Sequence, residues 1–323
     1  MGRFKHLYWE GHVTRLIRWF ALSALFTAPV YAQTSARRPP VIDMHVHSTQ
    51  TTPAAIPRLD SLNVRYWFLS SLAADLRTWQ SADSARYLPG LVFPCDRGRA
   101  PITGRPCFDN PSELPDTAWL RAEIKAGRIR AFGELSPQYL GMSPADPRLE
   151  PYWKMAEEFD IPVGIHMGLG PPGAAYESNP VPLKSPEYRM AYGDPMILEE
   201  VLLRHRRLRL FVMHAGWPRV ESMMALLYAH PSVYVDVAAL SWARLVPRAG
   251  YNRYIRDLVE GGFAKRIMFG SDFPDQVAAG IDAVLAADFL SAEAKADILC
   301  NNAMRFLRLP ASTCSPSSSR GDR

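Results

Sequence analysis

Two histidines near the start of the chain, His45 and His47, have the types and spacing that point most directly to chemistry. They end the apolar run 41–47, which is typical of a buried strand. Because residues two apart on a strand point to the same side, both imidazoles can face one point. Such a pair could chelate a metal ion, although two polar residues lining a barrel would give the same pattern.

Three more ionisable side chains follow other apolar runs, namely His166, His214 and Asp272. The carboxyl ends of parallel strands meet at one edge, so these side chains should converge with the histidine pair. A buried cluster of imidazoles and carboxylates is costly unless it binds a metal or carries out proton chemistry. His205 and His230 fall at expected helix ends, where we expect solvated side chains without a role.

The elements that must position these residues are short apolar runs alternating with longer segments of helical periodicity. The expected strands are 41–47, 64–72, 91–95, 129–135, 161–167, 208–215, 233–240 and 266–272. The expected helices are 116–127, 149–159, 195–205, 219–229 and 251–260, with two or three more in 282–309. Eight strands close a barrel, so the predicted fold is an α/β, (β/α)₈ TIM barrel.

Two connections, 96–115 and 168–194, are longer than ordinary loops. Both follow expected strands and so fall on the face where barrel enzymes do their chemistry. They are candidate walls or lids of a pocket, and surface insertions without function are the alternative.

The composition and charge of the chain indicate which class of binding partner to expect. The 323 residues are 48% hydrophobic and carry a net charge of +5. Four basic residues against one acidic residue place most of that excess in the first 32 positions, so the rest is close to neutral. A nucleic-acid partner is therefore not expected, and a small molecule is.

The chain start predicts export. Residues 1–32 read as a signal peptide with a cleavage site after Ala32, and their apolar run 19–26 is too short to span a bilayer. An uncleaved anchor or a buried helix is the alternative. We expect a linker at 33–40, one barrel domain at 41–309 and a disordered tail at 310–323, in a periplasmic or secreted protein without a membrane anchor after cleavage.

Four cysteines remain after cleavage, and their spacing matches no zinc ribbon. In an exported protein a disulfide between Cys95 and Cys107 is expected, and it would stiffen the first long loop. The rival pairing joins Cys300 to Cys314, and free buried thiols are the plain alternative.

The chain resembles the amidohydrolase superfamily, specifically the amidohydrolase-related family that includes aminocarboxymuconate-semialdehyde decarboxylase. The matching segments run in the family's order: 42–47, 133–134, 164–166, 213–218 and 269–274. This resemblance implies a metal-dependent barrel with one divalent ion per chain, most often Zn²⁺. It implies that His45, His47, His166 and Asp272 hold the ion and that His214 is a nearby acid/base group.

Glu134 marks a departure from the binuclear members of the superfamily, which commonly carry a carboxylated lysine at the end of strand four. No lysine lies nearby, which excludes a lysine carbamate bridge. A bridging Glu134 between two metals stays open. We expect one metal, with Glu134 as a fifth ligand or as a group that supports the ligands.

The expected mechanism follows from charge. An ion held by neutral imidazoles and one carboxylate stays positive and lowers the pKa of its bound water towards about 7, which supplies hydroxide. Asp272 can take the proton, and His214 can polarise a carbonyl or protonate the leaving group.

We therefore expect a metal-dependent hydrolase of a small ester, lactone or amide. The alternative is a metal-dependent decarboxylase, a lyase, of a carboxylated unsaturated or aromatic substrate. A non-catalytic periplasmic binding protein is a weaker rival, because it would have little need of both Asp272 and His214.

Candidate substrate-binding residues lie near the second long loop. Arg189 could clamp a carboxylate, Tyr176 and Tyr188 stand in the same loop, and Trp217 could form an apolar wall. A solvated arginine and a packing tryptophan are the plain alternatives. The sequence leaves open whether the chain forms homo-oligomers.

Overall fold

A computed structural model describes residues 38–315, except 83–84, 102 and 177–184. The predicted signal peptide 1–32 and most of the linker 33–40 lie outside the described residues. Among the residues that are described, no helix is long and apolar enough to cross a membrane.

The core of the structure is a single sheet of eight parallel strands, each paired with the next along the chain. The strands are β1 (Val41–His47), β2 (Val64–Ser71), β3 (Tyr87–Phe93), β4 (Ala131–Leu135), β5 (Val163–His166), β6 (Leu210–Met213), β7 (Tyr234–Asp236) and β8 (Ile267–Met268). The first strand meets the segment after the last, because Met44 N–H donates to Phe269 O at 2.9 Å and Asp272 N–H donates to His45 O at 2.8 Å. The predicted (β/α)₈ barrel is confirmed.

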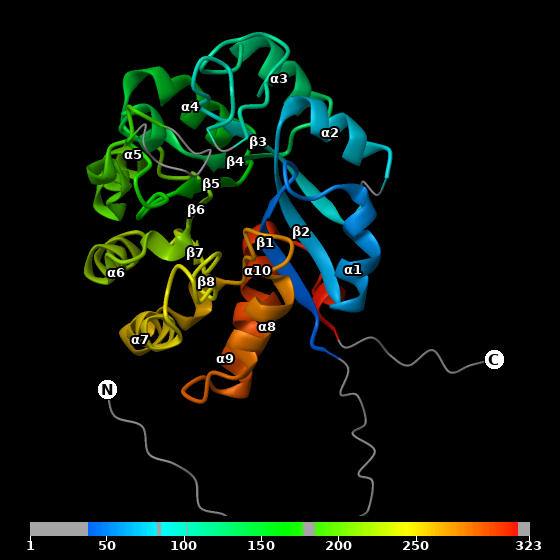
Figure 1. Ribbon diagram of the computed structural model, residues 1–323, viewed down its shortest axis with the longest axis vertical. Helices are drawn as coiled ribbons and strands as arrows, with labels where there is room; N and C mark the ends of the chain where they lie inside the picture. Colours follow the sequence, from blue (N-terminus) through cyan, green and yellow to red (C-terminus); the bar gives the residue numbers. More distant parts are fainter. Residues whose placement is uncertain (1–37, 83–84, 102, 177–184, 316–323) are drawn as a thin grey trace, which may run out of the picture. The chain divides into compact units, whose positions relative to one another are not determined.

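Helices surround the strands, as Figure 1 shows. They are α1 (Ile56–Ser61), α2 (Ala73–Gln80), α3 (Thr117–Lys125), α4 (Glu150–Glu158), α5 (Leu198–Arg204), α6 (Val220–Ala229), α7 (Arg248–Leu258), α8 (Val277–Leu285), α9 (Ala292–Ala296) and α10 (Asn302–Leu307). Each longer helix buries one apolar stripe; in α4 this stripe includes Tyr152, Trp153 and Met155. Asp116 caps α3 by accepting the Trp119 N–H.

Aromatic rings fill the interior of the barrel, and glycines on neighbouring strands leave room for them. Phe68 of β2 and Phe211 of β6 meet edge to face, with ring centroids 5.3 Å apart. A Cβ on Gly133 would lie 2.9 Å from the Phe68 ring, and one on Gly164 would lie 2.5 Å from the Phe211 ring. The two rings thus occupy space that larger residues on β4 and β5 would take, and they form a packed floor one layer below the strand ends.

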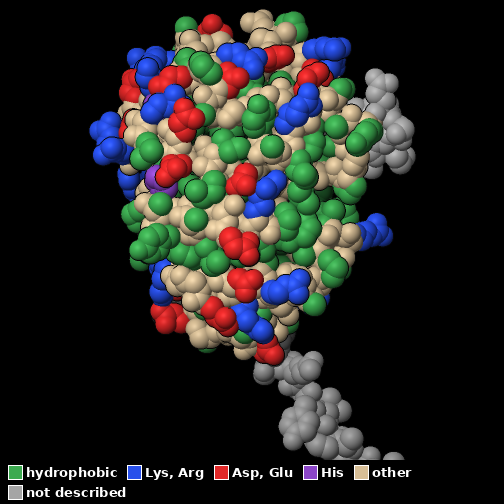
Figure 2. Space-filling model, turned by 90° about the vertical axis from the view of Figure 1, so that its left-hand side faces the viewer, with side chains coloured by type: hydrophobic (Ala, Val, Ile, Leu, Met, Phe, Trp, Pro, Cys, Tyr) green, Lys and Arg blue, Asp and Glu red, His purple; other side chains and the backbone are tan. Residues whose placement is uncertain are grey.

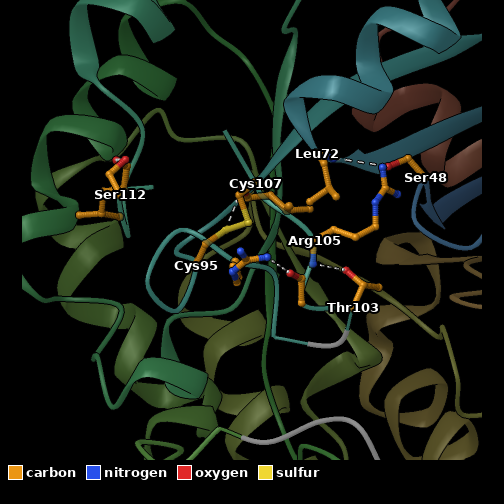
Figure 3. Close-up of a disulfide and its surroundings, with 11 residues drawn as sticks. Ser48, Leu72, Cys95, Thr103, Arg105, Cys107 and Ser112 are labelled. Carbon is orange, nitrogen blue, oxygen red and sulfur yellow. Dashed lines mark hydrogen bonds between the residues drawn. A yellow bond between two sulfur atoms is a disulfide. The ribbon is translucent and has the colours of Figure 1, made fainter. Parts of the chain in front are cut away.

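The structure contains a disulfide between Cys95 and Cys107, with the two Cα atoms 6.5 Å apart (Figure 3). It closes the loop after β3. Within that loop Arg105 donates to both carboxylate oxygens of Asp75 in α2, at 2.9 and 2.5 Å. Asp75 also accepts a hydrogen bond from Ser48, the residue after β1, at 2.9 Å. The bridged loop is therefore tied to the strand end that carries the histidine pair.

The end of the chain differs from the prediction. The rival Cys300–Cys314 disulfide forms as well, with the two Cα atoms 5.8 Å apart. Residues Ala311–Cys314 form a short 3₁₀ helix, so the predicted disordered tail does not begin at residue 310. The bridge to Cys300 explains the difference, because it holds this segment on the barrel. The rest of the predicted tail, 316–323, lies outside the described residues.

Candidate metal centre

Four side chains from three strand ends converge at the mouth of the barrel. His45 and His47 come from β1, Glu134 from β4, and Asp272 follows β8. The two Nε2 atoms lie 3.1 Å apart. Glu134 Oε2 lies 3.7 Å from His45 Nε2 and 3.2 Å from His47 Nε2. Asp272 Oδ1 lies at the same two distances, 3.7 and 3.2 Å, from those nitrogens.

This geometry fits a divalent ion. A tetrahedral ion with bonds of about 2.1 Å places its ligand atoms about 3.4 Å apart. The separations of 3.1–3.7 Å lie on both sides of that value. The donors are imidazole nitrogens and carboxylate oxygens, which Zn²⁺ and related ions accept. His45, His47 and Glu134 also form one of the candidate metal groups among the described residues.

The second oxygen of Glu134 faces two other histidines. Oε1 lies 2.5 Å from His166 Nδ1 and 3.3 Å from His214 Nε2, and those two nitrogens are 3.1 Å apart. The resemblance implies that His166 belongs to the same ligand set as His45 and His47. In the structure His166 contacts the opposite oxygen of Glu134, so this carboxylate stands between the two pairs of histidines.

The charged groups of the centre shift one another's pKa values. Burial alone would raise the pKa of Glu134, but His166 and the other histidines hold it well below its usual range. Burial would likewise raise the pKa of Asp272, which hydrogen bonding to His47 and the nearby histidine charges hold below its usual value. His47 behaves oppositely: burial lowers its pKa, but Asp272 and Glu134 outweigh burial and raise it to about 9. A proton on His47 thus offsets the charge of these carboxylates, and a bound cation would take over that role, whereas burial lowers the pKa of His166.

His214 adopts an uncommon backbone conformation. Its φ of 57° is left-handed, which is uncommon for a residue other than glycine. Its Nδ1 lies 3.1 Å from the carbonyl oxygen of Ala238, so Nδ1 donates there and Nε2 points to Glu134. Asp272 is also left-handed, with φ of 66°. The two proposed proton carriers therefore both lie at sharp turns just after strands.

Two buried aspartates were not predicted, although each stands at a strand next to the centre. Asp43 in β1 accepts the backbone N–H groups of His45 and Ser271 through Oδ1, and burial raises its pKa to about 6. Asp236 ends β7, and its Oδ2 lies 3.2 Å from His45 Nδ1. The one sequence signal was an acidic residue inside each of the apolar runs 41–47 and 233–240, and such a residue shows no partner until the strands are placed.

The predicted substrate-binding residues differ in their contacts and in their exposure to solvent. The Arg189 guanidinium donates to the Tyr188 carbonyl oxygen at 3.0 Å and pairs with Glu187 at 3.6 Å, so its partners belong to its own loop. The Tyr188 hydroxyl accepts the Gly170 N–H at 2.7 Å. Trp217 is partly buried against the outer core, and Tyr176 is 70% exposed.

Aromatic rings that the sequence did not single out lie closer to the centre. Tyr139, after β4, stands with its ring centroid 5.3 Å from that of His166 and 5.4 Å from that of Tyr188. Phe273 directly follows Asp272 and packs on Trp242 at a centroid distance of 5.0 Å. Flat apolar surfaces therefore stand next to the ligand groups.

The expectation that His205 is solvated is wrong. It is buried rather than solvated, and its ring nitrogens lie 3.3 Å from Glu150 and 3.4 Å from Glu157, both of α4. Two carboxylate partners compensate for its burial. It remains outside the metal centre.

Comparisons with known proteins agree with this architecture. The sequence profile of a family described as Amidohydrolase matches residues 95–309. No curated protein sequence matches the chain.

Solved structures are similar in fold at low sequence identity. An uncharacterised TIM-barrel protein from Bordetella bronchiseptica is 16% identical with a TM-score of 0.58, over 83% of this chain and 98% of that one. A protein from Pseudomonas putida assigned as a 2-pyrone-4,6-dicarboxylic acid hydrolase is 15% identical with a TM-score of 0.56, over 84% and 98%. A dihydroxybenzoic acid decarboxylase from Polaromonas, with bound manganese and the inhibitor 2-nitroresorcinol, is 12% identical with a TM-score of 0.53, over 86% and 99%.

Proposed function

The chain belongs to the amidohydrolase family whose profile it matches, and from that premise we propose that it is a metal-dependent hydrolase of a small ester, lactone or amide. The observation that carries the proposal is the convergence of His45, His47, Glu134 and Asp272 at ligand-to-ligand distances. We propose one divalent ion per chain, with Zn²⁺ as the first candidate. Manganese, which the Polaromonas decarboxylase binds, is the second.

When bound, a divalent cation supplies Lewis-acid activation of a water molecule and of a substrate oxygen. His45, His47, Glu134 and Asp272 would hold it. His166, on the other oxygen of Glu134, would orient that carboxylate or join the ligand set.

Two side chains would move protons. Asp272 Oδ1 lies beside the ligand nitrogens and would accept the proton of the attacking water. His214 donates to Ala238 O through Nδ1, which leaves Nε2 as the atom that carries a proton to the leaving group. Burial lowers the pKa of His214, but hydrogen bonding to Glu134 and the Asp272 charge outweigh it and raise the pKa, which favours the protonated ring that this role needs.

A decarboxylase is the second candidate, and the aromatic rings beside the centre favour it. Tyr139 and Phe273 could flank a planar ring or a conjugated chain. His214 would then give its proton to carbon as carbon dioxide leaves. Decarboxylases are among the structures of similar fold, which is consistent with this second candidate.

One assay separates the candidates. Metal-loaded enzyme is incubated with panels of esters, lactones, amides and carboxylated aromatic compounds, and acid release and carbon dioxide are measured separately. Acid release without carbon dioxide supports the hydrolase. Carbon dioxide without net hydrolysis supports the decarboxylase and rejects the hydrolase. Turnover that persists unchanged after complete metal removal would reject both.

We further propose that the protein is exported and acts outside the cytoplasm on a small molecule. Two disulfides among the described residues support an oxidising compartment. Amino-terminal sequencing of protein recovered from its native host tests this proposal, with Gln33 expected as the first residue. An intact residue 1 in the recovered protein would contradict it.

A further inference from the structure

Asp236 contacts both His45 and His214 of the candidate metal centre, and these three residues also form one of the candidate metal groups among the described residues. The carboxylate is fully buried at the end of β7. Its Oδ1 accepts the backbone N–H of His214 and that of Ala238, each at 2.9 Å. Through this oxygen it holds the left-handed turn that aims the His214 ring at Glu134.

The other oxygen of Asp236 faces the His45 ring. Oδ2 lies 3.2 Å from His45 Nδ1, and the His45 ring is fully buried. Neither atom has a hydrogen bond to any other group in the described part of the chain. Two buried polar atoms that lack other hydrogen-bond partners thus face each other at a distance suited to an N–H···O bond.

Gly270 leaves the space that this contact needs. A Cβ at that position would lie 3.0 Å from His45 Cβ and 3.2 Å from Asp236 Cγ. A side chain at position 270 would crowd both His45 and Asp236. Backbone, carboxylate and imidazole therefore fit together at this point without room for another group.

We propose that Asp236 is a positioning residue of the metal centre: it keeps the proton of His45 on Nδ1, so that the Nε2 lone pair faces the ion. Carboxylates commonly orient metal-binding imidazoles in this way, and their loss typically weakens metal binding by about 10–100-fold. This inference rests on the proposed metal centre, and it adds a role for a residue outside the ligand set.

Asp236→Asn tests the proposal, with Asp43→Asn as the matched control. Both aspartates are fully buried and accept two backbone N–H groups through Oδ1, but only Asp236 presents Oδ2 to a ligand imidazole. Asparagine keeps the accepting oxygen. At position 236 its NH₂ group would face His45 Nδ1 and favour the tautomer with the proton on Nε2, which blocks the metal. Zinc affinity is measured by competition with a chromogenic chelator, and the melting temperature of each metal-free protein is measured in parallel.

We expect Asp236→Asn to bind zinc at least about tenfold more weakly than the wild type, and Asp43→Asn to stay within about threefold. Equal zinc affinity in Asp236→Asn and wild type would overturn the proposal. An equal loss of zinc affinity in both variants would also overturn it, because replacing any buried carboxylate near the centre would then have the same effect as replacing Asp236. If the wild type itself binds no zinc or manganese, the metal centre fails rather than the role of Asp236.

A measurement on the wild type covers the case in which Asp236→Asn does not fold. Long-range ¹H–¹⁵N spectra of histidine-labelled, zinc-loaded protein report which ring nitrogen of His45 carries the proton, and a His45→Gln sample assigns the signal. We expect the proton on Nδ1. A protonated Nε2, or a metal shift on Nδ1, would overturn the proposal.

Discussion

At the scale of single residues, Glu134 of β4 lies between the histidines of the candidate metal centre, at a position where this chain has no lysine. Its two oxygens divide four histidines into two pairs, His45 with His47 and His166 with His214. A free carboxylate can take the place that a carboxylated lysine would take between ligand groups. The sequence showed that Glu134 was present, but not which imidazole faced which oxygen.

The role of His214 leads to the first prediction. His214→Asn should keep the metal, since His45, His47 and Asp272 are untouched, while the chemical step slows by roughly 10²–10⁴-fold, the usual contribution of a placed acid/base group. Metal content and single-turnover rates measure the two effects. His205→Asn, which changes a buried histidine outside the centre, should leave the chemical step unchanged. Loss of metal in His214→Asn would make His214 a ligand instead.

The second prediction concerns pH and the metal-free protein. The pKa of His47 is raised from 6.5 to about 9 in the folded chain. Its contribution to stability is therefore complete below pH 6.5 and is lost as pH rises through about 9, at a linkage of about 1.4 kcal/mol per unit. Urea unfolding of metal-free protein should show a lower free energy of unfolding at pH 9 than at pH 6.5.

The control for this prediction is His47→Gln, which should remove most of that decline. In the wild type, zinc affinity should rise over the same pH range, because the ion displaces the His47 proton. Zinc affinity and stability that do not change between pH 6.5 and 9 would contradict the assignment of the raised pKa.

At the scale of elements, each predicted strand overlaps an observed one, but several bounds differ, as for β3, which was predicted at 91–95 and spans Tyr87–Phe93. Strand β1 matches its prediction, Val41–His47. The prediction for β6 ran to residue 215, but the strand ends at Met213 because His214 and Ala215 are left-handed. Strand β8 likewise ends at Met268, before the turn at Asp272. Apolar patterning cannot show these turns, because they are set by contacts with other strands.

The glycines in the barrel give the third prediction. Gly164→Ala places a Cβ 2.5 Å from atoms of both Phe211 and Met213, so overpacking should cost about 1–3 kcal/mol. Gly250→Ala, in helix α7 with one ordinary contact at 3.4 Å, should instead stabilise the protein by about 0.5–1 kcal/mol. Urea unfolding of both variants measures the two changes. A Gly164→Ala protein as stable as the wild type would show that the barrel floor is not closely packed.

At the scale of the whole molecule, the order of strands and the convergence of the site followed from the sequence, since eight βα units dictate both. The contacts of Asp236 and Tyr139 did not, because they join strands and loops far apart in the chain. On the face shown in Figure 2, acidic, basic and apolar side chains are intermixed, without a broad area of one charge. The absence of a nucleic-acid partner stays a prediction.

The most direct measurement is the metal content of the purified protein alongside its activity. We expect about one divalent ion per chain in the wild type, and neither ion nor turnover in a His45→Ala, His47→Ala double variant that remains folded, because each histidine supplies a direct bond to the ion. Full activity in that variant after the metal has been removed would contradict the proposed centre.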